Sequence, residues 1–181
     1  MSLFVIVLPL SPLKVDDSFS VSDWPLHVTV VPTFSIDLPA TDVAAEMAAE
    51  FASHETVTVT ASEDELFGPL ANILVTVIDN SPALQSLHLS LTASLKALGA
   101  TFESPEFVAT GYRAHVTVTP HCRVASGDKL LLEQLALVDM HPEPSTDRRR
   151  VTATFPLRGS PVAHTPATMT TRIRNGSTGH S

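Results

Sequence analysis

The side chains with the most chemistry lie in two copies of one short motif. The sequence His-Val-Thr-Val occurs at residues 27–30 and again at residues 115–118, so the two histidines are 88 positions apart, about half the chain. An aromatic residue stands three positions before each histidine, and a proline stands five positions after it. A match of this length, at this spacing, indicates the duplication of one structural lobe.

The spacing within each copy favours a site for a phosphate group. Side chains on a strand alternate between two faces, so His27 and Thr29 share one face, as do His115 and Thr117. The valines between them point to the other face and can be buried. If the two copies face each other, two imidazoles and two hydroxyl groups converge. One imidazole can accept a proton while the other donates one, because both forms are accessible near neutral pH.

A third His-x-Thr sequence, at residues 54–56, is a chance match. It lacks the valines, the preceding aromatic residue and the following proline, and it lies between a predicted helix and a predicted strand. A lone His-x-Thr therefore carries no information, whereas the complete repeat is specific.

The elements that must position the motifs are mostly strands. Period-two alternation and β-branched residues predict strands, and apolar residues at helical spacing predict two helices. Consecutive strands occur too often for a doubly wound sheet, so the pattern predicts an α+β fold with mainly antiparallel sheets. The predicted strands are 3–8, 26–31, 57–60, 72–78, 113–119, 135–140 and 151–157, and the predicted helices are 42–53 and 82–98. Pro32 and Pro120 are expected to end their strands.

The second helix has the clearest signals. Ser81 can cap its first turn, and Pro82 occupies the first helical position, where the missing N–H costs nothing. Gly99 is placed to end it in a left-handed conformation. Its leucines form one apolar stripe, at positions 84, 87, 91, 95 and 98.

Composition bounds the class of protein. The apolar fraction of 44% suits a packed domain over residues 1–160, and the net charge of −8 argues against a grip on long nucleic acid through phosphate contacts alone. One cysteine excludes an internal disulfide framework. The apolar start is typical of a strand, and no stretch is long enough to span a membrane. We therefore expect a cytoplasmic monomer, not bound to a membrane, with a flexible tail over residues 161–181.

The repeated motif resembles that of a known family. The sequence is similar, over about residues 3–158, to the two-histidine phosphoesterase superfamily, which includes LigT-like RNA 2′,3′-cyclic phosphodiesterases, also called 2′-5′ RNA ligases. That family carries two His-hydrophobic-Thr/Ser-hydrophobic motifs about half a chain apart. The family often has proline before the second histidine, whereas this chain has Ala114.

The resemblance implies a bilobal fold with two pseudo-symmetric sheets, helices on the outside and the active site in a central cleft. It implies that His27 and His115 are the catalytic pair and that Thr29 and Thr117 hold the phosphate. It also implies a reaction without a metal or cofactor. One histidine activates water to attack the cyclic phosphorus, and the other protonates the leaving ribose oxygen, which leaves a 2′-phosphate.

Several other residues have two interpretations each. Trp24 and Tyr112 could stack on a nucleobase or belong to the core. Arg113 and Arg123 could contact phosphate or lie solvated at the surface. The run Arg148–Arg150 could contact an RNA backbone or simply open a strand. His121 and Cys122 have no partners at metal-ligand spacing, and His88 is expected to be structural.

The sequence leaves the exact activity open. The leading hypothesis is a phosphodiesterase acting on a small nucleotide or an RNA end with a cyclic phosphate. The alternatives are a nucleotide-binding module without turnover, a 2′-5′ RNA ligase, and a hydrolase of another cyclic or 2′-5′-linked nucleotide. A purely structural or partner-binding domain is the third class.

Overall fold

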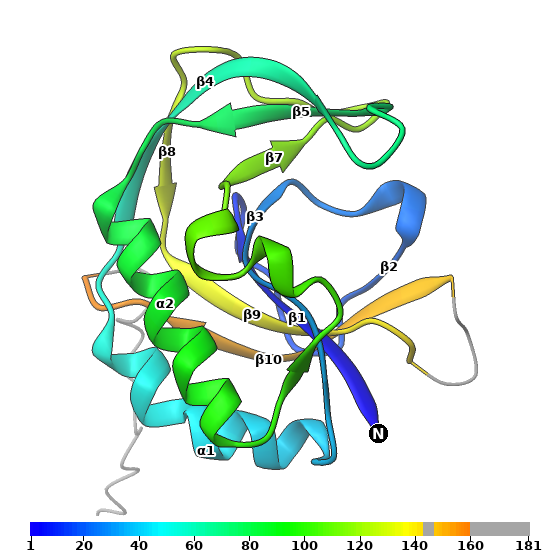
Figure 1. Cartoon of the computed structure of the whole chain (residues 1–181), viewed down its shortest axis with the longest axis vertical. Helices are drawn as coiled ribbons and strands as arrows, with labels where there is room; N and C mark the ends of the chain where they lie inside the picture. Colours follow the sequence, from blue (N-terminus) through cyan, green and yellow to red (C-terminus); the bar gives the residue numbers. More distant parts are fainter. Residues whose placement is uncertain (143–146, 160–181) are drawn as a thin grey trace, which may run out of the picture.

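A single path of antiparallel strands forms the framework of the molecule (Figure 1). The computed structural model of the chain describes residues 1–142 and 147–159. The strand order is β2-β10-β9-β1-β3-β7-β5-β4-β8, and β6 pairs with β3. The strands are β1 (Ser2–Pro9), β2 (Ser18–Ser20), β3 (His27–Ile36), β4 (Val57–Phe67), β5 (Ile73–Ile78), β6 (Thr101–Phe102), β7 (His115–Thr117), β8 (Lys129–Leu132), β9 (Gln134–Asp139) and β10 (Arg148–Pro156). The helices are α1 (Ala40–Ser53) and α2 (Pro82–Ala97), with short 3-10 turns at Val21–Asp23, Pro105–Phe107 and Ala109–Gly111.

The sheet divides into two halves that meet at the motif strands. One half runs from β2 to β3 and the other from β7 to β8. They join where β3 pairs with β7, with Val28 opposite Val116. Figure 1 shows the second half curling over the first. The predicted α+β class with mainly antiparallel strands is therefore confirmed, and the two halves are continuous at the motifs.

Two hydrophobic clusters lie on opposite faces of the first half. The larger one lies between the sheet and the helices, where α1 packs on β10 and α2 packs on β3 and α1. Val28 and Val116 are fully buried in it, as their alternation with the motif residues requires. The smaller cluster lies on the other face, which carries the motif histidines. Its core is Val5, Val7, Leu13, Ala136, Val138 and Val151.

Helix α2 begins and ends as its sequence predicts. The Ser81 hydroxyl accepts a hydrogen bond from the Leu84 N–H at 3.2 Å, and Pro82 opens the first turn. Gly99 has φ +91°, the left-handed conformation that favours glycine. The described residues contain no helix that is both long and apolar enough to cross a membrane.

Pro32 does not end its strand, which corrects the prediction. Strand β3 continues to Ile36, because a bulge accommodates the proline. Between the pairs Ile6–Val31 and Phe4–Phe34, β1 advances by two residues and β3 by three. The extra residue in β3 lets the chain pass Pro32 without the N–H that a regular ladder would need.

Other strand boundaries also differ from the prediction. Strand β4 extends to Phe67, well beyond the predicted 57–60, whereas β7 covers only three residues of the predicted 113–119. The short strands β2, β6 and β8 were not predicted, because they carry too few residues to show an alternation. The predicted tail, 161–181, lies outside the described residues.

Candidate active site

The antiparallel register brings the two motifs side by side. Val28 lies opposite Val116, so one further step in each direction sets His27 opposite Thr117 and Thr29 opposite His115. Residues directly opposite in such a pair project to the same face, with Cβ atoms roughly 4.5–5.5 Å apart. All four polar side chains therefore leave the sheet on one face, while both valines are buried on the other. The sequence predicted this convergence.

Each histidine is held in the same tautomer by its own chain. The Nδ1 atom of His27 lies 2.7 Å from the carbonyl oxygen of Pro25, and that of His115 lies 2.8 Å from the carbonyl oxygen of Arg113. A carbonyl can only accept, so Nδ1–H donates in both cases. The Nε2 atom is then left to exchange protons with a substrate. In both copies the accepting carbonyl belongs to the residue two positions before the histidine, so the hydrogen bonding repeats as the sequence does.

Burial lowers the pKa of both imidazoles. Loss of solvent is the largest cause for His27, opposed by the bond to Pro25 and reinforced by the charge of His115. Loss of solvent also dominates for His115, where the carbonyl bond raises the pKa and the charge of Arg113 lowers it. Because the charge of His115 affects His27, protonation of one imidazole disfavours protonation of the other.

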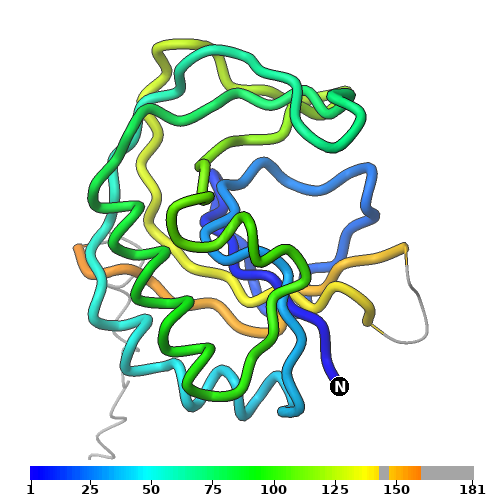
Figure 2. The backbone as a smooth tube through the Cα atoms, in the orientation of Figure 1, coloured from blue at the N-terminus to red at the C-terminus, as the bar shows by residue number. Residues whose placement is uncertain are grey.

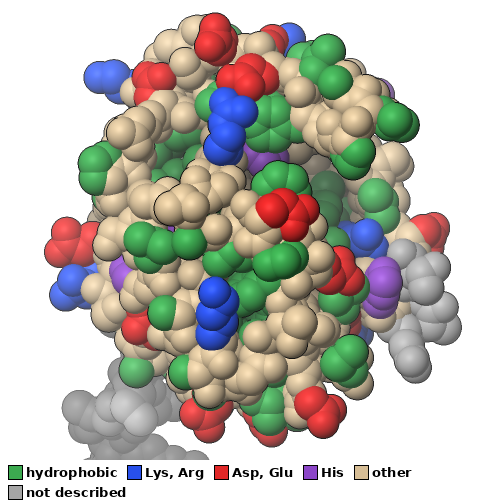
Figure 3. All heavy atoms as spheres, in the orientation of Figure 1, with side chains coloured by type: hydrophobic (Ala, Val, Ile, Leu, Met, Phe, Trp, Pro, Cys, Tyr) green, Lys and Arg blue, Asp and Glu red, His purple; other side chains and the backbone are tan. Residues whose placement is uncertain are grey.

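Four polar atoms on this face have no hydrogen-bond partner among the described residues. Neither Nε2 atom, and neither hydroxyl of Thr29 and Thr117, makes a hydrogen bond within the part of the chain that the structure describes. Two imidazole nitrogens and two hydroxyls are thus available together. Figure 3, in the orientation of Figure 1, shows one histidine side chain recessed between hydrophobic and charged side chains.

An aromatic ring rests against each histidine. The Trp24 ring lies 4.5 Å from His27 and is itself stacked on Phe19 at 5.7 Å. Phe67 lies edge-on to His115 at 4.8 Å. The sequence singled out Trp24 but not Phe67, which comes from the end of β4. Its contact with His115 runs diagonally across three strands, so no local signal could have revealed it.

Arg113 lies beside His115, but its guanidinium already has a partner. It binds the Glu65 carboxylate through two hydrogen bonds, of 3.0 and 2.7 Å, and lies over the Phe67 ring at 4.9 Å. The ion pair lowers the pKa of Glu65. A contact between Arg113 and phosphate would require this pair to open, and it stays a prediction.

Tyr112 faces the larger core cluster and ties the second motif to the first. Its hydroxyl donates to the carbonyl of Thr29 at 3.0 Å, and its ring stacks on His88 at 4.0 Å. His88 in turn donates from Nδ1 to the Val30 carbonyl at 2.7 Å, and its Nε2 accepts from the Ala109 N–H at 3.0 Å. Figure 2 shows the green segment between α2 and β7, which carries Ala109 and Tyr112, looping back over the first half of the sheet before it leads into β7. The network fixes the approach to His115 against the backbone of β3.

The role of His88 gives a prediction about stability. Burial lowers its pKa, and the pKa values of His27 and His115 are lowered as well. In the unfolded chain these imidazoles take up protons near pH 6.5, whereas in the folded chain they take up protons only at lower pH. The free energy of unfolding should therefore fall as the pH drops below about 6.5.

Urea unfolding at pH 7.5 and pH 5.5 measures this effect. In the His88→Asn variant, which keeps a donor near Nδ1 but cannot titrate, the difference between the two pH values should be smaller. Equal stability of the unmodified chain at both values would contradict the prediction.

The other arginines that the sequence singled out have partners within the protein. Arg123 binds Asp64, and Arg148 binds Ser18 across the β10–β2 pair. Arg149 lies 6.0 Å from the Trp24 ring and donates to the Met140 carbonyl. His121 and Cys122 are exposed. Among the described residues, no three His, Cys, Asp or Glu side chains are placed to hold a metal ion.

A family model and several solved structures match the chain. The model of the 2′-5′ RNA ligase superfamily matches residues 9–154. E. coli LigT bound to 3′-AMP is 11% identical, with a TM-score of 0.58, over 87% of this chain and 98% of LigT. E. coli LigT bound to NADP+ gives 11% and 0.57, over 86% and 97%. The protein TT0787 of Thermus thermophilus gives 19% and 0.54, over 88% and 99%. No curated protein matches the chain.

Proposed function

The chain belongs to the 2′-5′ RNA ligase superfamily, and from that premise we propose that it is a phosphodiesterase that opens 2′,3′-cyclic phosphates without a metal ion. Membership supports a phosphoesterase or 2′-5′ RNA ligase type of function. The finer proposal depends on one observation, the register that places each motif histidine opposite the threonine of the other motif.

The proposed reaction uses the two free Nε2 atoms. One imidazole takes a proton from water as the water oxygen forms a bond to phosphorus. The bond from phosphorus to the 3′ oxygen breaks, and the second imidazole, protonated at the start, gives its proton to that oxygen. A 2′-phosphate results, and proton exchange with solvent restores both histidines. Either histidine can be the base, because both have the same tautomer.

The hydroxyls of Thr29 and Thr117 would stabilise the negative charge that builds on the non-bridging phosphate oxygens. Donors aimed at the non-bridging oxygens are worth more as negative charge develops, particularly where water is excluded. Neither hydroxyl makes a hydrogen bond within the described chain, so neither must break one in order to donate to the phosphate.

A small nucleotide or an RNA end is the proposed substrate. The net charge of −8 disfavours extended contact with a nucleic-acid backbone. E. coli LigT, which shares the fold, has been crystallised with 3′-AMP, with ATP and with NADP+. Both histidines come from one chain, so we propose that a monomer carries the complete site. The cytoplasmic location stays a prediction.

Turnover in EDTA tests the proposal directly. The purified protein would be incubated with 2′,3′-cyclic mononucleotides and with an oligonucleotide ending in a cyclic phosphate, and the position of the product phosphate would be determined. We expect 2′-phosphate products at a rate that EDTA leaves unchanged.

Other results would point elsewhere. Loss of activity in EDTA would contradict the metal-free mechanism. A folded protein, shown by circular dichroism, that binds these nucleotides without converting them would be a binding module. Joining of 5′-hydroxyl and cyclic-phosphate ends would favour a ligase.

The lowered histidine pKa values predict an acidic optimum. The reaction needs one imidazole neutral and the other protonated, so kcat/KM should follow a bell-shaped curve between the two free-enzyme pKa values. Burial lowers both from about 6.5. The centre of the curve for a 2′,3′-cyclic mononucleotide should therefore lie below about pH 6.5. A maximum at about pH 7 or above would contradict this prediction.

A further inference from the structure

The Arg113 guanidinium is a flat group held in place beside the second motif. Two hydrogen bonds to the Glu65 carboxylate, of 3.0 and 2.7 Å, hold it on one edge. The Phe67 ring lies against it, with 4.9 Å between Cζ and the centre of the ring. A guanidinium that is both paired and stacked is pre-organised, because each contact restricts its rotation. Its position is therefore set before any ligand binds, although the Arg113 side chain is 54% exposed.

Strand pairing places this group on the face that carries the motif histidines. Glu65 lies opposite Val75, and Val75 lies opposite Thr117, so the three side chains project to one face. Phe67, two residues after Glu65, projects to the same face, and its ring centre lies 4.8 Å from that of His115. The guanidinium is thus no farther from that imidazole than the two ring distances added together, a span that one ribose can cover.

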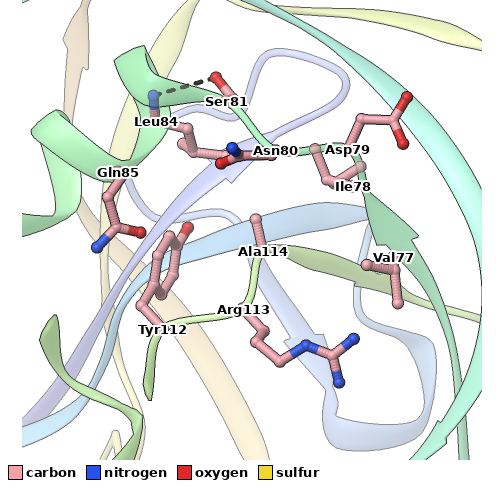
Figure 4. Close-up of a pocket in the computed structure, with 10 residues that line it drawn as sticks. All are labelled: Val77, Ile78, Asp79, Asn80, Ser81, Leu84, Gln85, Tyr112, Arg113 and Ala114. Carbon is pink, nitrogen blue, oxygen red and sulfur yellow. Dashed lines mark hydrogen bonds between the residues drawn. The ribbon is translucent and has the colours of Figure 1, made fainter. Parts of the chain in front are cut away.

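The side of the guanidinium away from Phe67 is open to solvent. Among the described residues, the Arg113 side chain makes no hydrogen bond, ion pair or ring contact beyond those with Glu65 and Phe67. Figure 4 shows it extending away from Leu84 and the Tyr112 ring, which pack in the larger core cluster. A flat ligand group can therefore stack on the guanidinium from the solvent side.

The two aromatic rings that the sequence singled out already have ring partners. Trp24 contacts both Phe19 and His27, and Tyr112 stacks on His88 at 4.0 Å. A nucleobase that stacked on Tyr112 would have to open this contact in the core. The guanidinium offers a flat surface on the motif face without such a cost.

A guanidinium with a carboxylate partner suits a nucleobase better than a phosphate. Glu65 already compensates the charge, so a phosphate would have to displace a partner with two hydrogen bonds. The face of a base requires no such exchange, because arginine stacks on flat rings through its own face. Arginine planes support bases in this way in proteins that bind single-stranded nucleic acids.

We propose that the nucleobase of the substrate stacks on Arg113, which then lies between the base and the Phe67 ring. This inference rests on the proposed function, since it places the cyclic phosphate at His27 and His115. Arg113 contacts the base and takes no part in the chemical step. Stacking reads no hydrogen-bonding edge, so every base can bind, and a purine offers the larger face.

Arg113→Lys tests the proposal, because lysine keeps the charge and can still pair with Glu65 but has no flat face. The measurement is KM and kcat for 2′,3′-cyclic AMP and for methyl riboside 2′,3′-cyclic phosphate, which has the same sugar and phosphate but no base. For cyclic AMP we expect KM to rise about tenfold, as for the loss of one stacking contact, with kcat within about twofold. For the methyl riboside, both constants should change by less than about twofold.

Arg123→Lys is the matched control. Arg123 is 51% exposed and binds Asp64 at 2.5 Å, so the same change is made in a second ion pair of β4. Asp64 lies opposite Thr76 and accepts a hydrogen bond from its hydroxyl. Thr76 precedes the strand partner of His115, so it projects to the other face. Arg123→Lys should therefore leave the constants for both substrates unchanged.

Both variants should keep the thermal midpoint of the unmodified protein. Each alters one exposed ion pair, and such pairs contribute little to stability. A change in KM can then be assigned to the contact with the substrate.

The inference and the proposed function can fail separately. If the unmodified protein opens both cyclic phosphates but Arg113→Lys leaves KM for cyclic AMP unchanged, the base does not stack on Arg113. An equal loss for both substrates, or a loss in kcat, would also overturn the inference, since it would mean that the guanidinium contacts the phosphate.

If no cyclic phosphate is opened, the proposed function fails, and binding then decides the inference. The unmodified protein and Arg113→Lys would be titrated with adenosine 2′-phosphate and with inorganic phosphate. Weaker binding of the adenosine ligand alone would support stacking on Arg113. Unchanged affinity for it, or an equal loss for both ligands, would overturn the inference.

Discussion

Replacing either motif histidine by alanine should lower kcat for a 2′,3′-cyclic mononucleotide by about 10² to 10⁴-fold. Each imidazole is expected to move a proton in the same step, and no other titratable side chain in the described chain lies opposite the motif threonines to replace it. His27→Ala and His115→Ala should fall by similar factors, because the two share their tautomer and their burial. The change should appear in kcat more than in KM.

The pH profiles of the two variants would also assign the roles. The acidic limb of the bell reports the base, which must lose its proton, and the alkaline limb reports the acid. The variant that loses the acidic limb has therefore lost the base.

His54→Ala is the control for these variants, since His54 belongs to the chance His-x-Thr sequence. Its ring contacts Glu50 on α1 and lies away from both motifs. It should keep full activity, while a large loss in His54→Ala, or full activity in either motif variant, would contradict the paired-histidine mechanism.

Replacing both motif threonines by valine should have the second largest effect. Valine keeps the shape and the strand preference of threonine but removes the hydroxyl. Loss of one donor to a developing charge typically costs about 10² to 10³-fold in kcat, so Thr29→Val and Thr117→Val should each fall in or near that range. The double variant should be slower than either single variant.

Thr58→Val provides the matched control, because Thr58 is an exposed strand residue on β4 with no side-chain hydrogen bond in the described chain. It should retain kcat. Circular dichroism and thermal unfolding should show all of these proteins folded, so that a lower kcat is due to the site. Retention of full activity without both hydroxyls would exclude the proposed role of the threonines.

The fold could be predicted where a local pattern is long enough. Helix α2 shows its cap, its apolar stripe and its terminal glycine in the sequence alone. Strand β3 could not be delimited, because a bulge that absorbs Pro32 depends on its pairing with β1. The limits of the three-residue β7 could not be predicted either, because they depend on its pairing with β3 and β5.

The site was predictable only in the part that the duplication marks. The repeat singled out His27, Thr29, His115 and Thr117 as candidate site residues, because the alternation of strand side chains sets which residues share a face. The repeat did not show that Trp24 and Tyr112 have different surroundings. The structure places Trp24 against His27, whereas Tyr112 stacks on His88 in the larger core. The equivalent positions of the two copies have thus taken different packing roles.

The pairing of Val28 with Val116 makes the two copies of the motif dependent on each other. Of the two motif threonines, the one opposite each histidine belongs to the other half of the chain. Residues opposite each other have closer Cβ atoms than residues two apart on one strand. Neither half alone therefore holds the complete proposed site, although each carries a complete motif. In double-mutant cycles, the coupling energy should be larger for His27 with Thr117 and for His115 with Thr29 than for the pairs within one motif.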